Sequence, residues 1–252
     1  MKLLLKISFL GTNYNGYQVQ PDKPTVQQKL NEATARIFGY DCDIVGCSRT
    51  DSGVHANEFF VCVSKKGENS ISCTIPMENV PLAFNSVLPN DISVLQAKMI
   101  DSDFHPRYDV KYKEYIYKIW NNPIKNPFYS DRAFHIPQKY SDEIVTKMND
   151  AAQHYCGNHD FVSFMAQGSK IVDTSRNVKY ASVYKEGDFI VFKVAANGFL
   201  YNMVRIMCGT LLLVAQGKIE PCDIKEIINS KNRKNAGATV PACGLYLNKV
   251  EY

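Results

Sequence analysis

The stretch CDIVGCSRTDSGVHANEFFVCVS, residues 42–64, places a short polar segment between two apolar runs. Residues 42–48 and 54–64 have the composition of β-strands. The segment 49–53, Arg-Thr-Asp-Ser-Gly, resembles a strand connection of roughly five residues. A carboxylate at such a turn, here that of Asp51, can face a cleft. Taken alone, however, an aspartate before Ser-Gly is more often a turn residue than a functional one.

The segments around this stretch predict a ferredoxin-like order for the first hundred residues. Residues 3–10 are typical of a strand. Thr25 and Gln28 form a capping-box start for a helix that runs to about residue 38 and ends at Gly39. A helix over 76–88, interrupted at Pro81, and a strand over 92–100 complete the order β-α-β-β-α-β.

A second block of similar composition follows. The predicted elements are a tyrosine-rich strand 111–120, a loop 121–137, a helix 141–156, strands 176–185 and 188–196 around a Glu186-Gly187 hairpin, a helix 199–216, a short helix after Pro221, and a strand 244–250. We therefore predict an α+β protein with two ferredoxin-like, RRM-like α/β halves, residues 1–103 and 104–252. Their sheets are expected to be mainly antiparallel and to face a central cleft.

The composition limits the class of protein. The chain has 252 residues, 45% of them hydrophobic and 21% charged, which is ordinary for a globular protein. A net charge of +4 permits an RNA partner without demanding one. Lys6 and Ser8 interrupt the first apolar run, so it is too short for a signal peptide. The apolar stretch 198–216 contains Arg205, whose insertion into a bilayer costs roughly 2.5 to 3.5 kcal/mol, and this favours a buried helix.

The eight cysteines do not form a recognisable metal or redox motif. None of them stands in a CxxC pair, so the spacing of a zinc knuckle or thiol redox site is missing. Several lie within apolar strand or helix patterns, which is typical of reduced, core-filling thiols in the cytosol. We therefore expect no metal site and a cytoplasmic protein.

Arg205 is the most unusual residue of the apolar helix. A guanidinium in such a setting is paired or is destabilised by several kcal/mol. The nearest acids in sequence, Asp188 and Glu220, lie outside the helix, so a carboxylate partner must come from elsewhere in the fold. If it is Asp51, the pair lowers the pKa of that aspartate and keeps it ionised, as a nucleophile or base requires. The alternative is an arginine that extends to the surface.

Aromatic and basic side chains cluster on the strand 111–120. Tyr115 and Tyr117 share one face, which could stack on a pyrimidine with about 1 to 3 kcal/mol per base. The alternative is that they fill the core or the surface.

Two basic groups are candidates either for phosphate binding or for simple solvated charge: Arg107, Lys111, Lys113 and Lys118, and Lys231, Arg233 and Lys234.

Several motifs agree in order with one known family. They are GTNYNGYQVQ (11–20), TVQ (25–27), RTDSGVHA (49–56), FHPR (104–107), KEYIY (113–117), HDFVSF (159–164), NMVR (202–205) and PACGLYL (241–247). In these segments the chain resembles the tRNA pseudouridine synthase A family from residue 3 to the last strand. Leu10, Tyr17 and Ser48 depart from the usual acidic residue, tryptophan and glycine of that family.

The resemblance implies the pseudouridine synthase fold and an enzyme that isomerises uridine to pseudouridine at positions 38–40 of the tRNA anticodon arm. It implies that Asp51 is the catalytic aspartate, that Arg205 pairs with it, and that Tyr115 stacks on the base. It further implies substrate binding by Tyr115, Arg49, His55 and Arg107, a homodimer that clasps the tRNA, and no metal or other cofactor.

Other functions fit the residues less well. A non-catalytic RNA-binding module with the same fold is the main alternative, because RNA-recognition domains also carry aromatic side chains on strands. A zinc deaminase needs His-x-Glu and Pro-Cys-x-x-Cys, but His55 is followed by Ala-Asn, and Cys243 lacks the second cysteine. A glycosidase needs two placed acids, and the motifs place only one.

Overall fold

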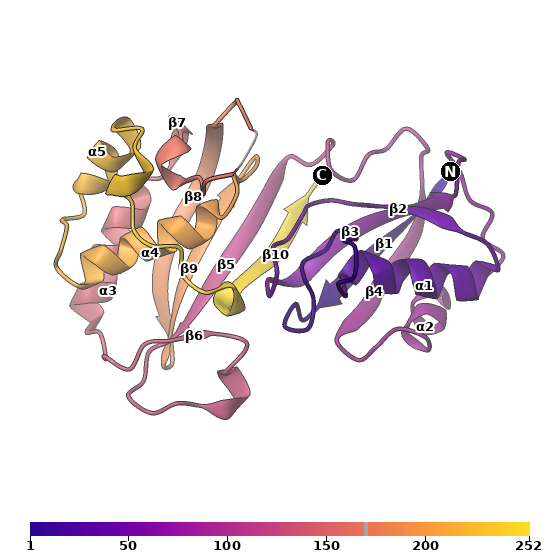
Figure 1. The fold of residues 1–252 in the computed structure, drawn as a ribbon, viewed down its shortest axis with the longest axis horizontal. Coiled ribbons are helices and arrows are strands. Elements are labelled where there is room, and N and C mark those ends of the chain that lie inside the picture. The colour runs from indigo at the N-terminus through magenta and orange to yellow at the C-terminus, as the bar shows by residue number, and fades with distance from the viewer. Residues whose placement is uncertain (169–170) are drawn as a thin grey trace. The chain divides into compact units, whose positions relative to one another are not determined.

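The structure, a computed structural model, describes residues 1–168 and 171–252. The chain divides into two compact units, which Figure 1 shows as ribbons. Unit 1 comprises Met1–Lys111 and Leu247–Tyr252, and unit 2 comprises Tyr112–Tyr246. The predicted junction after residue 103 therefore lies within unit 1. The last strand, predicted as part of the second domain, contributes its residues from Leu247 onward to unit 1 because it lies beside a strand of that unit.

Unit 1 has the predicted ferredoxin-like order. Its elements are β1 (Lys2–Phe9), α1 (Val26–Phe38), β2 (Cys42–Gly46), β3 (His55–Lys65), α2 (Val80–Asn85) and β4 (Ile92–Ile100). The strands are antiparallel in the order β4-β1-β3, and β2 pairs with β3. Leu5 of β1 lies opposite Val61 on one side and Ala97 on the other, which fixes the register. β10 (Leu245–Glu251) neighbours β3.

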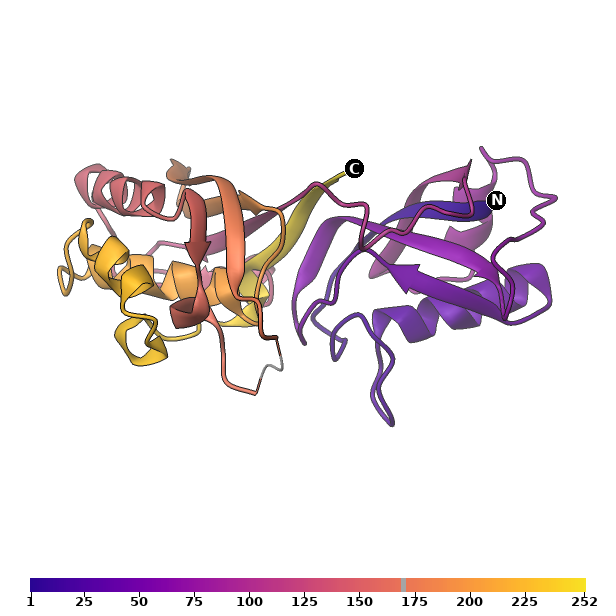
Figure 2. The ribbon, with the colours of Figure 1, turned by 90° about the horizontal axis from the view of Figure 1, so that it is seen from above.

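The helices of unit 1 follow from local signals. The Thr25 side chain accepts a hydrogen bond from Gln28 N at 3.3 Å, and Gly39 ends α1 with a φ of 75°, so both predicted ends of α1 are confirmed. Figure 2 shows α1 beneath the sheet of unit 1. The helix predicted from residue 76 is shorter: α2 begins at Val80, and Pro81 lies in its first turn, where a missing N–H is tolerated.

Unit 2 adds two short strands to a similar order. Its elements are β5 (Tyr112–Trp120), β6 (Phe134–His135), α3 (Asp142–Gln153), β7 (Gly157–Asp160), β8 (Ser175–Glu186), β9 (Phe189–Ala196), α4 (Met203–Ala215), α5 (Asp223–Asn229) and single 3-10 turns at Pro127–Tyr129, Val162–Phe164, Arg233–Asn235 and Ala242–Gly244. The strand order is β5-β9-β8-β7, with antiparallel neighbours, and β6 runs parallel to β5. β6 and β7 were not predicted, because two and four residues are too few for a periodic pattern.

The apolar helix α4 forms the interior of unit 2. Most of its side chains are buried, as the sequence predicted. It begins at Met203 and not at residue 199, because Asn202 takes a left-handed φ of 59° that interrupts helical geometry. Within the described part of the chain, no helix combines the length and apolar character that a bilayer crossing needs.

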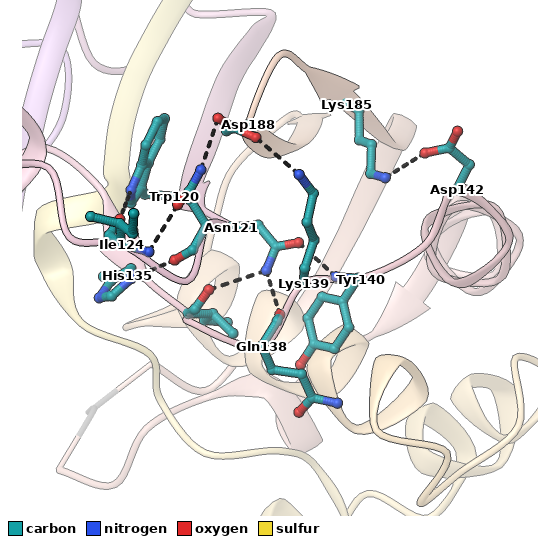
Figure 3. A network of polar contacts seen from close by, with 12 residues as sticks. Trp120, Asn121, Ile124, His135, Gln138, Lys139, Tyr140, Asp142, Lys185 and Asp188 are labelled. Atoms are coloured by element: carbon teal, nitrogen blue, oxygen red, sulfur yellow. Dashed lines mark hydrogen bonds and ion pairs between the residues drawn. The ribbon is translucent and has the colours of Figure 1, made fainter.

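The loop after β5, predicted as irregular, is held by the polar network in Figure 3. Asn121 is buried and occupies its centre. Its Nδ2 donates to Gln138 O at 2.7 Å and to Ile136 O at 3.2 Å, and its Oδ1 accepts from Tyr140 N at 2.9 Å. These bonds satisfy backbone groups that a buried loop would otherwise leave unpaired. The network fixes the C-terminal end of β5, the strand that carries Tyr115 near its start.

Candidate active site

Asp51 lies in a tight turn between β2 and β3 of unit 1. Val54 N donates to Asp51 O at 3.2 Å, which closes the turn. Gly53 has a φ of 77°, a left-handed conformation that glycine adopts without strain. Asp51 is half-buried, whereas its neighbours Arg49 and Ser52 are exposed. The carboxylate is therefore carried by a backbone of defined shape at the start of a core strand.

The loop of residues 11–20, which we call the first loop, holds this turn through its backbone. Tyr14 O accepts hydrogen bonds from Gly53 N at 3.2 Å and from Ser52 Oγ at 3.3 Å. Tyr17 N donates to Thr50 O at 3.3 Å. The residues on both sides of Asp51 are thus bonded to a single neighbouring loop.

Two glycines allow the first loop to approach the Asp51 turn. A Cβ atom at Gly11 would lie 2.0 Å from Val54 O, and one at Gly16 would lie 2.4 Å from Thr50 O. Both distances are far below van der Waals contact, so any side chain at either position would displace the turn or the loop. Gly16 also has a φ of 87°, which a residue with a Cβ adopts only with strain.

Asp91, the residue before β4, anchors the first loop. Its Oδ1 accepts a hydrogen bond of 2.5 Å from the Tyr14 hydroxyl, and its Oδ2 accepts one of 3.2 Å from Asn13 Nδ2. Leu10 N donates to Asp91 O at 2.9 Å. Burial and the hydrogen bond to Asp91 raise the pKa of Tyr14, so this phenol remains protonated and acts as a donor.

His55 lies behind the turn in the interior of unit 1. Its side chain is fully buried, and its Nδ1 accepts a hydrogen bond from Gly11 N at 2.9 Å. Because Nδ1 is the acceptor, the neutral ring carries its proton on Nε2. This bond ties the start of β3 to the start of the first loop.

The two arginines expected to bind substrate in unit 1 are both exposed. Arg49 belongs to the Asp51 turn. Arg107 follows His105 and Pro106, which line a hollow of about 450 Å³ together with Cys42 at the beginning of β2. The Asp51 turn follows the other end of β2, so the structure places Arg49, but not Arg107, in the same turn as Asp51.

Arg205 lies in the first turns of α4 in unit 2, where two neutral oxygens fix its guanidinium. Its Nε donates to Val240 O at 2.7 Å, and its Nη1 donates to Asn202 Oδ1 at 2.7 Å. The left-handed backbone of Asn202 places this amide beside an arginine three residues later. The orientation of the guanidinium is therefore fixed by two acceptors, a backbone carbonyl and a side-chain amide oxygen.

A close approach of backbones sets the position of the Val240 carbonyl. A Cβ at Gly209 of α4 would lie 1.9 Å from Ala238 O. Gly237 N donates to Thr210 Oγ1 at 2.9 Å, which holds the segment before Val240 against the helix. This contact fixes one of the two acceptors that orient Arg205.

Tyr115 and Tyr117 lie on β5, and both are buried. The Tyr115 ring packs edge-to-face on Phe199, with 5.0 Å between ring centres and an interplanar angle of 81°. The Tyr117 hydroxyl donates to Pro241 O at 2.7 Å. Since Arg205 bonds the adjacent Val240 carbonyl, β5 and α4 meet at one short segment of chain.

The predicted site residues therefore fall into two groups. Asp51, Arg49, His55 and Arg107 belong to unit 1, and Tyr115 and Arg205 belong to unit 2. No cluster of three His, Cys, Asp or Glu side chains suited to a metal ion occurs among residues 1–168 and 171–252.

The sequence interpretation missed the roles of three supporting residues. Tyr14 and Asn202 lie within motifs that the sequence singled out, but a motif does not show which atoms bond. Asp91 lay in no motif, and its partner Tyr14 is 77 positions away, so no local signal marked it.

Comparisons with known proteins give a consistent result. The family described as "tRNA pseudouridine synthase" matches residues 6–109 and 151–252 of this chain. A protein named "tRNA pseudouridine synthase A" from Thermoanaerobacter sp. (strain X514) is 41% identical over 250 residues, which cover 99% of both chains. A protein of the same name from Bacillus pumilus (strain SAFR-032) is 41% identical over 254 residues. Another, from Clostridium acetobutylicum, is 40% identical over 248 residues. Each of these matches covers at least 98% of both chains.

Proposed function

The chain belongs to the tRNA pseudouridine synthase family, and on this premise we propose that it isomerises uridine to pseudouridine at positions 38, 39 and 40 of the tRNA anticodon arm. The observation that carries the proposal is 41% identity over 99% of both chains to a protein named tRNA pseudouridine synthase A. The close contact that Gly11 and Gly16 allow between the first loop and the Asp51 turn supports the proposal, because a catalytic carboxylate must be held in a fixed position.

The reaction is an isomerisation, so no atom is gained or lost overall. The bond from N1 of uracil to C1′ of the ribose breaks, the base turns while it stays bound, and C5 bonds to C1′. The proton on C5 leaves, and N1 gains one. Asp51 acts on the sugar, either by attack on the ribose or by starting an elimination from it. One ionised carboxylate is sufficient, and neither route requires a metal or a redox cofactor.

We assign Arg205 as the partner that holds the charge and position of Asp51. Its guanidinium is oriented in unit 2 by Val240 O and Asn202 Oδ1, which prepares it for a carboxylate. Tyr115 is assigned to stack on the target base and to assist proton removal from C5. Its position on a core strand, packed on Phe199, supports a defined ring orientation.

The remaining predicted residues take different parts in the proposal. Arg49 is exposed in the Asp51 turn, which supports a role in filling the gap that a flipped nucleotide leaves in the RNA. His55 is buried and bonded to Gly11 N, which supports a positioning role in place of the predicted substrate contact. Arg107 remains proposed as a ligand of RNA phosphate outside the Asp51 turn.

The proposal includes the setting in which the enzyme works. A tRNA substrate implies a cytoplasmic protein. We further propose that it acts as a homodimer whose two subunits together clasp one tRNA. The charge of +4 per chain supports binding of the RNA backbone that weakens with added salt.

The decisive experiment maps pseudouridine in tRNA transcripts that carry uridine at only one of positions 38, 39 and 40. We expect wild-type protein to convert each of them. Asp51→Asn and Arg205→Ala should give no product, and the first should still bind RNA. Asp41→Asn is a matched control, because Asp41 is an exposed aspartate of unit 1 that pairs with Lys66.

An Asp51→Asn protein with a normal rate would refute the assignment of the nucleophile. Wild-type protein that binds tRNA and forms no pseudouridine would instead favour the non-catalytic RNA-binding module. The names of the relatives argue against that alternative, since each is described as a synthase.

A further inference from the structure

A basic segment that carries Lys231, Arg233 and Lys234 borders a hollow in unit 2 that the proposed mechanism does not use. The hollow has a volume of about 440 Å³. Arg233 and Lys234 line it together with Gln167 and Thr239. Its walls therefore carry two cationic side chains, an amide and a hydroxyl, and no acidic side chain is among the described residues that line it.

Arg233 bonds only neutral oxygens in the described part of the chain. Its Nη1 donates to Gly237 O at 2.9 Å and to Ala236 O at 3.2 Å, and its Nη2 is 3.4 Å from Thr239 Oγ1. A guanidinium has five N–H donors, so these three bonds leave capacity for a further acceptor. Partial burial lowers the pKa of Arg233, because it removes water from the charged guanidinium.

The neighbouring lysines differ from one another. Lys231 Nζ lies 3.1 Å from Asp160 Oδ2, so its charge is already paired. Lys234 is exposed, and its ammonium makes no ion pair or hydrogen bond within the described residues. Arg233 and Lys234 thus place at one hollow two positive charges that no acidic side chain among the described residues pairs with.

The hollow is attached to the helix that carries Arg205. Gly237 N bonds Thr210 Oγ1 at 2.9 Å, and the Gly209 backbone meets Ala238 closely. Arg205 Nε in turn bonds Val240 O at 2.7 Å, directly after the segment that lines the hollow. A ligand held there would therefore be placed in a fixed relation to the guanidinium of Arg205.

We infer that this hollow binds a backbone phosphate of the RNA substrate, through Arg233 and Lys234. The inference rests on the proposed function, because it names a contact of the same substrate. A phosphodiester fits the lining better than a neutral ligand does: guanidinium groups match the geometry of phosphate oxygens, and the Gln167 amide offers a further donor. The contact fixes the RNA backbone without reading its sequence.

The test measures tRNA affinity as a function of salt concentration, using full-length protein and a tRNA transcript. We expect Arg233→Gln and Lys234→Gln each to weaken binding about five- to tenfold at low salt. Each should also reduce the slope of log K against log salt by about one. Lys147→Gln is the matched control, since Lys147 is an exposed lysine of α3 in the same unit, and it should match wild type.

Affinity and turnover separate this inference from the proposed function. At saturating tRNA, both variants should still form pseudouridine, whereas Asp51→Asn should form none. Loss of affinity with an unchanged slope, or an unchanged affinity for Lys234→Gln, would overturn the inference. Lys234→Gln decides the matter if Arg233→Gln unfolds, because the Lys234 side chain makes no hydrogen bond or ion pair to any residue that the structure describes.

A second arm distinguishes RNA from free phosphate. Inorganic phosphate is titrated against thermal unfolding of wild type and both variants. If the variants lose phosphate binding but keep the wild-type salt slope for tRNA, the hollow is a site for the free anion, and the inference is wrong.

Discussion

Asp51 and Arg205 are held in place by different kinds of contact. The Asp51 turn is held mainly through backbone groups: Tyr14 O and Thr50 O accept hydrogen bonds, and Gly16 allows the first loop to approach closely. Arg205 is fixed through its own side chain, which bonds Asn202 Oδ1 and Val240 O. The first residue is placed by the shape of the chain, and the second by the chemistry of its guanidinium.

This difference determines which substitutions each region tolerates. Around Asp51, the close fit of the first loop to the turn leaves no room for an added Cβ at Gly11 or Gly16. Around Arg205, the backbone accepts changes that preserve its conformation, but loss of the Asn202 amide removes an acceptor. Each region can therefore be broken by a substitution that would be harmless in the other.

Among the residues that support Asp51 and Arg205, the largest effect is expected from Gly16→Ala. Its Cβ would lie 2.4 Å from Thr50 O, so the Asp51 turn must move. A displacement of about 1 Å at a catalytic group lowers the rate roughly 100-fold, and we expect kcat to fall at least that far. Single-turnover rates and thermal unfolding check this.

Gly39→Ala is the matched control, because Gly39 also has a positive φ, of 75°, but nothing lies within 4 Å of an added Cβ. It should destabilise the fold by about 1 kcal/mol and leave kcat unchanged. Equal rates for both variants would show that the fit of the first loop does not position Asp51.

A smaller effect is expected from Asn202→Gly. Glycine accepts the left-handed φ of 59° without strain, so the start of α4 is preserved while the acceptor of Arg205 Nη1 is lost. A hydrogen bond to a charged group is worth about 1.5 to 3 kcal/mol, and partial loss of orientation should lower kcat about tenfold with little change in KM. Steady-state kinetics across tRNA concentrations measures the two separately. A changed KM with an unchanged kcat would contradict the role of Asn202 in orienting Arg205.

The smallest effect concerns pH and a side-chain bond elsewhere in unit 2. The Thr174 hydroxyl donates to Asp160 Oδ1 at 2.5 Å, and this bond, with contributions from Lys231 and Val162 N, lowers the pKa of Asp160. A lowered folded-state pKa stabilises the fold above the ordinary value of 3.8, and the stabilisation is lost as pH falls through the folded value. Thr174→Val should therefore lower Tm at neutral pH, and the difference from wild type should shrink below about pH 4. Thermal unfolding between neutral and acid pH measures it, and a difference that grows in acid would reverse the assigned sign.

Local patterns were sufficient to predict much of the fold. Thr25 and Gly39 mark the ends of α1 because capping depends on residues a few positions apart. The composition of residues 3–10 and 54–64 predicted the strands β1 and β3, because it too is a local property. β6 and the late start of α4 were missed, because they depend on contacts with distant residues and on the left-handed backbone of Asn202.

The candidate site shows the same limit. The apolar setting of Arg205 and the polar turn around Asp51 are visible as breaks in a local pattern. The Tyr14–Asp91 bond and the fit of Gly16 against Thr50 are not visible, because they join segments that meet only in the folded unit. The partnership of Asp51 with Arg205 stays a prediction.

The assignment of Leu247–Tyr252 to unit 1 has a consequence for synthesis of the protein on the ribosome. The rest of unit 1 is made first, but its final strand follows the whole of unit 2 in the chain. Unit 2 is one uninterrupted segment of the sequence and can fold as soon as it emerges. Until Leu247–Tyr252 are synthesised, the sheet of unit 1 has an unpaired edge where β10 will lie beside β3. Synthesis of unit 1, which carries Asp51, therefore begins before that of unit 2 and is completed after it.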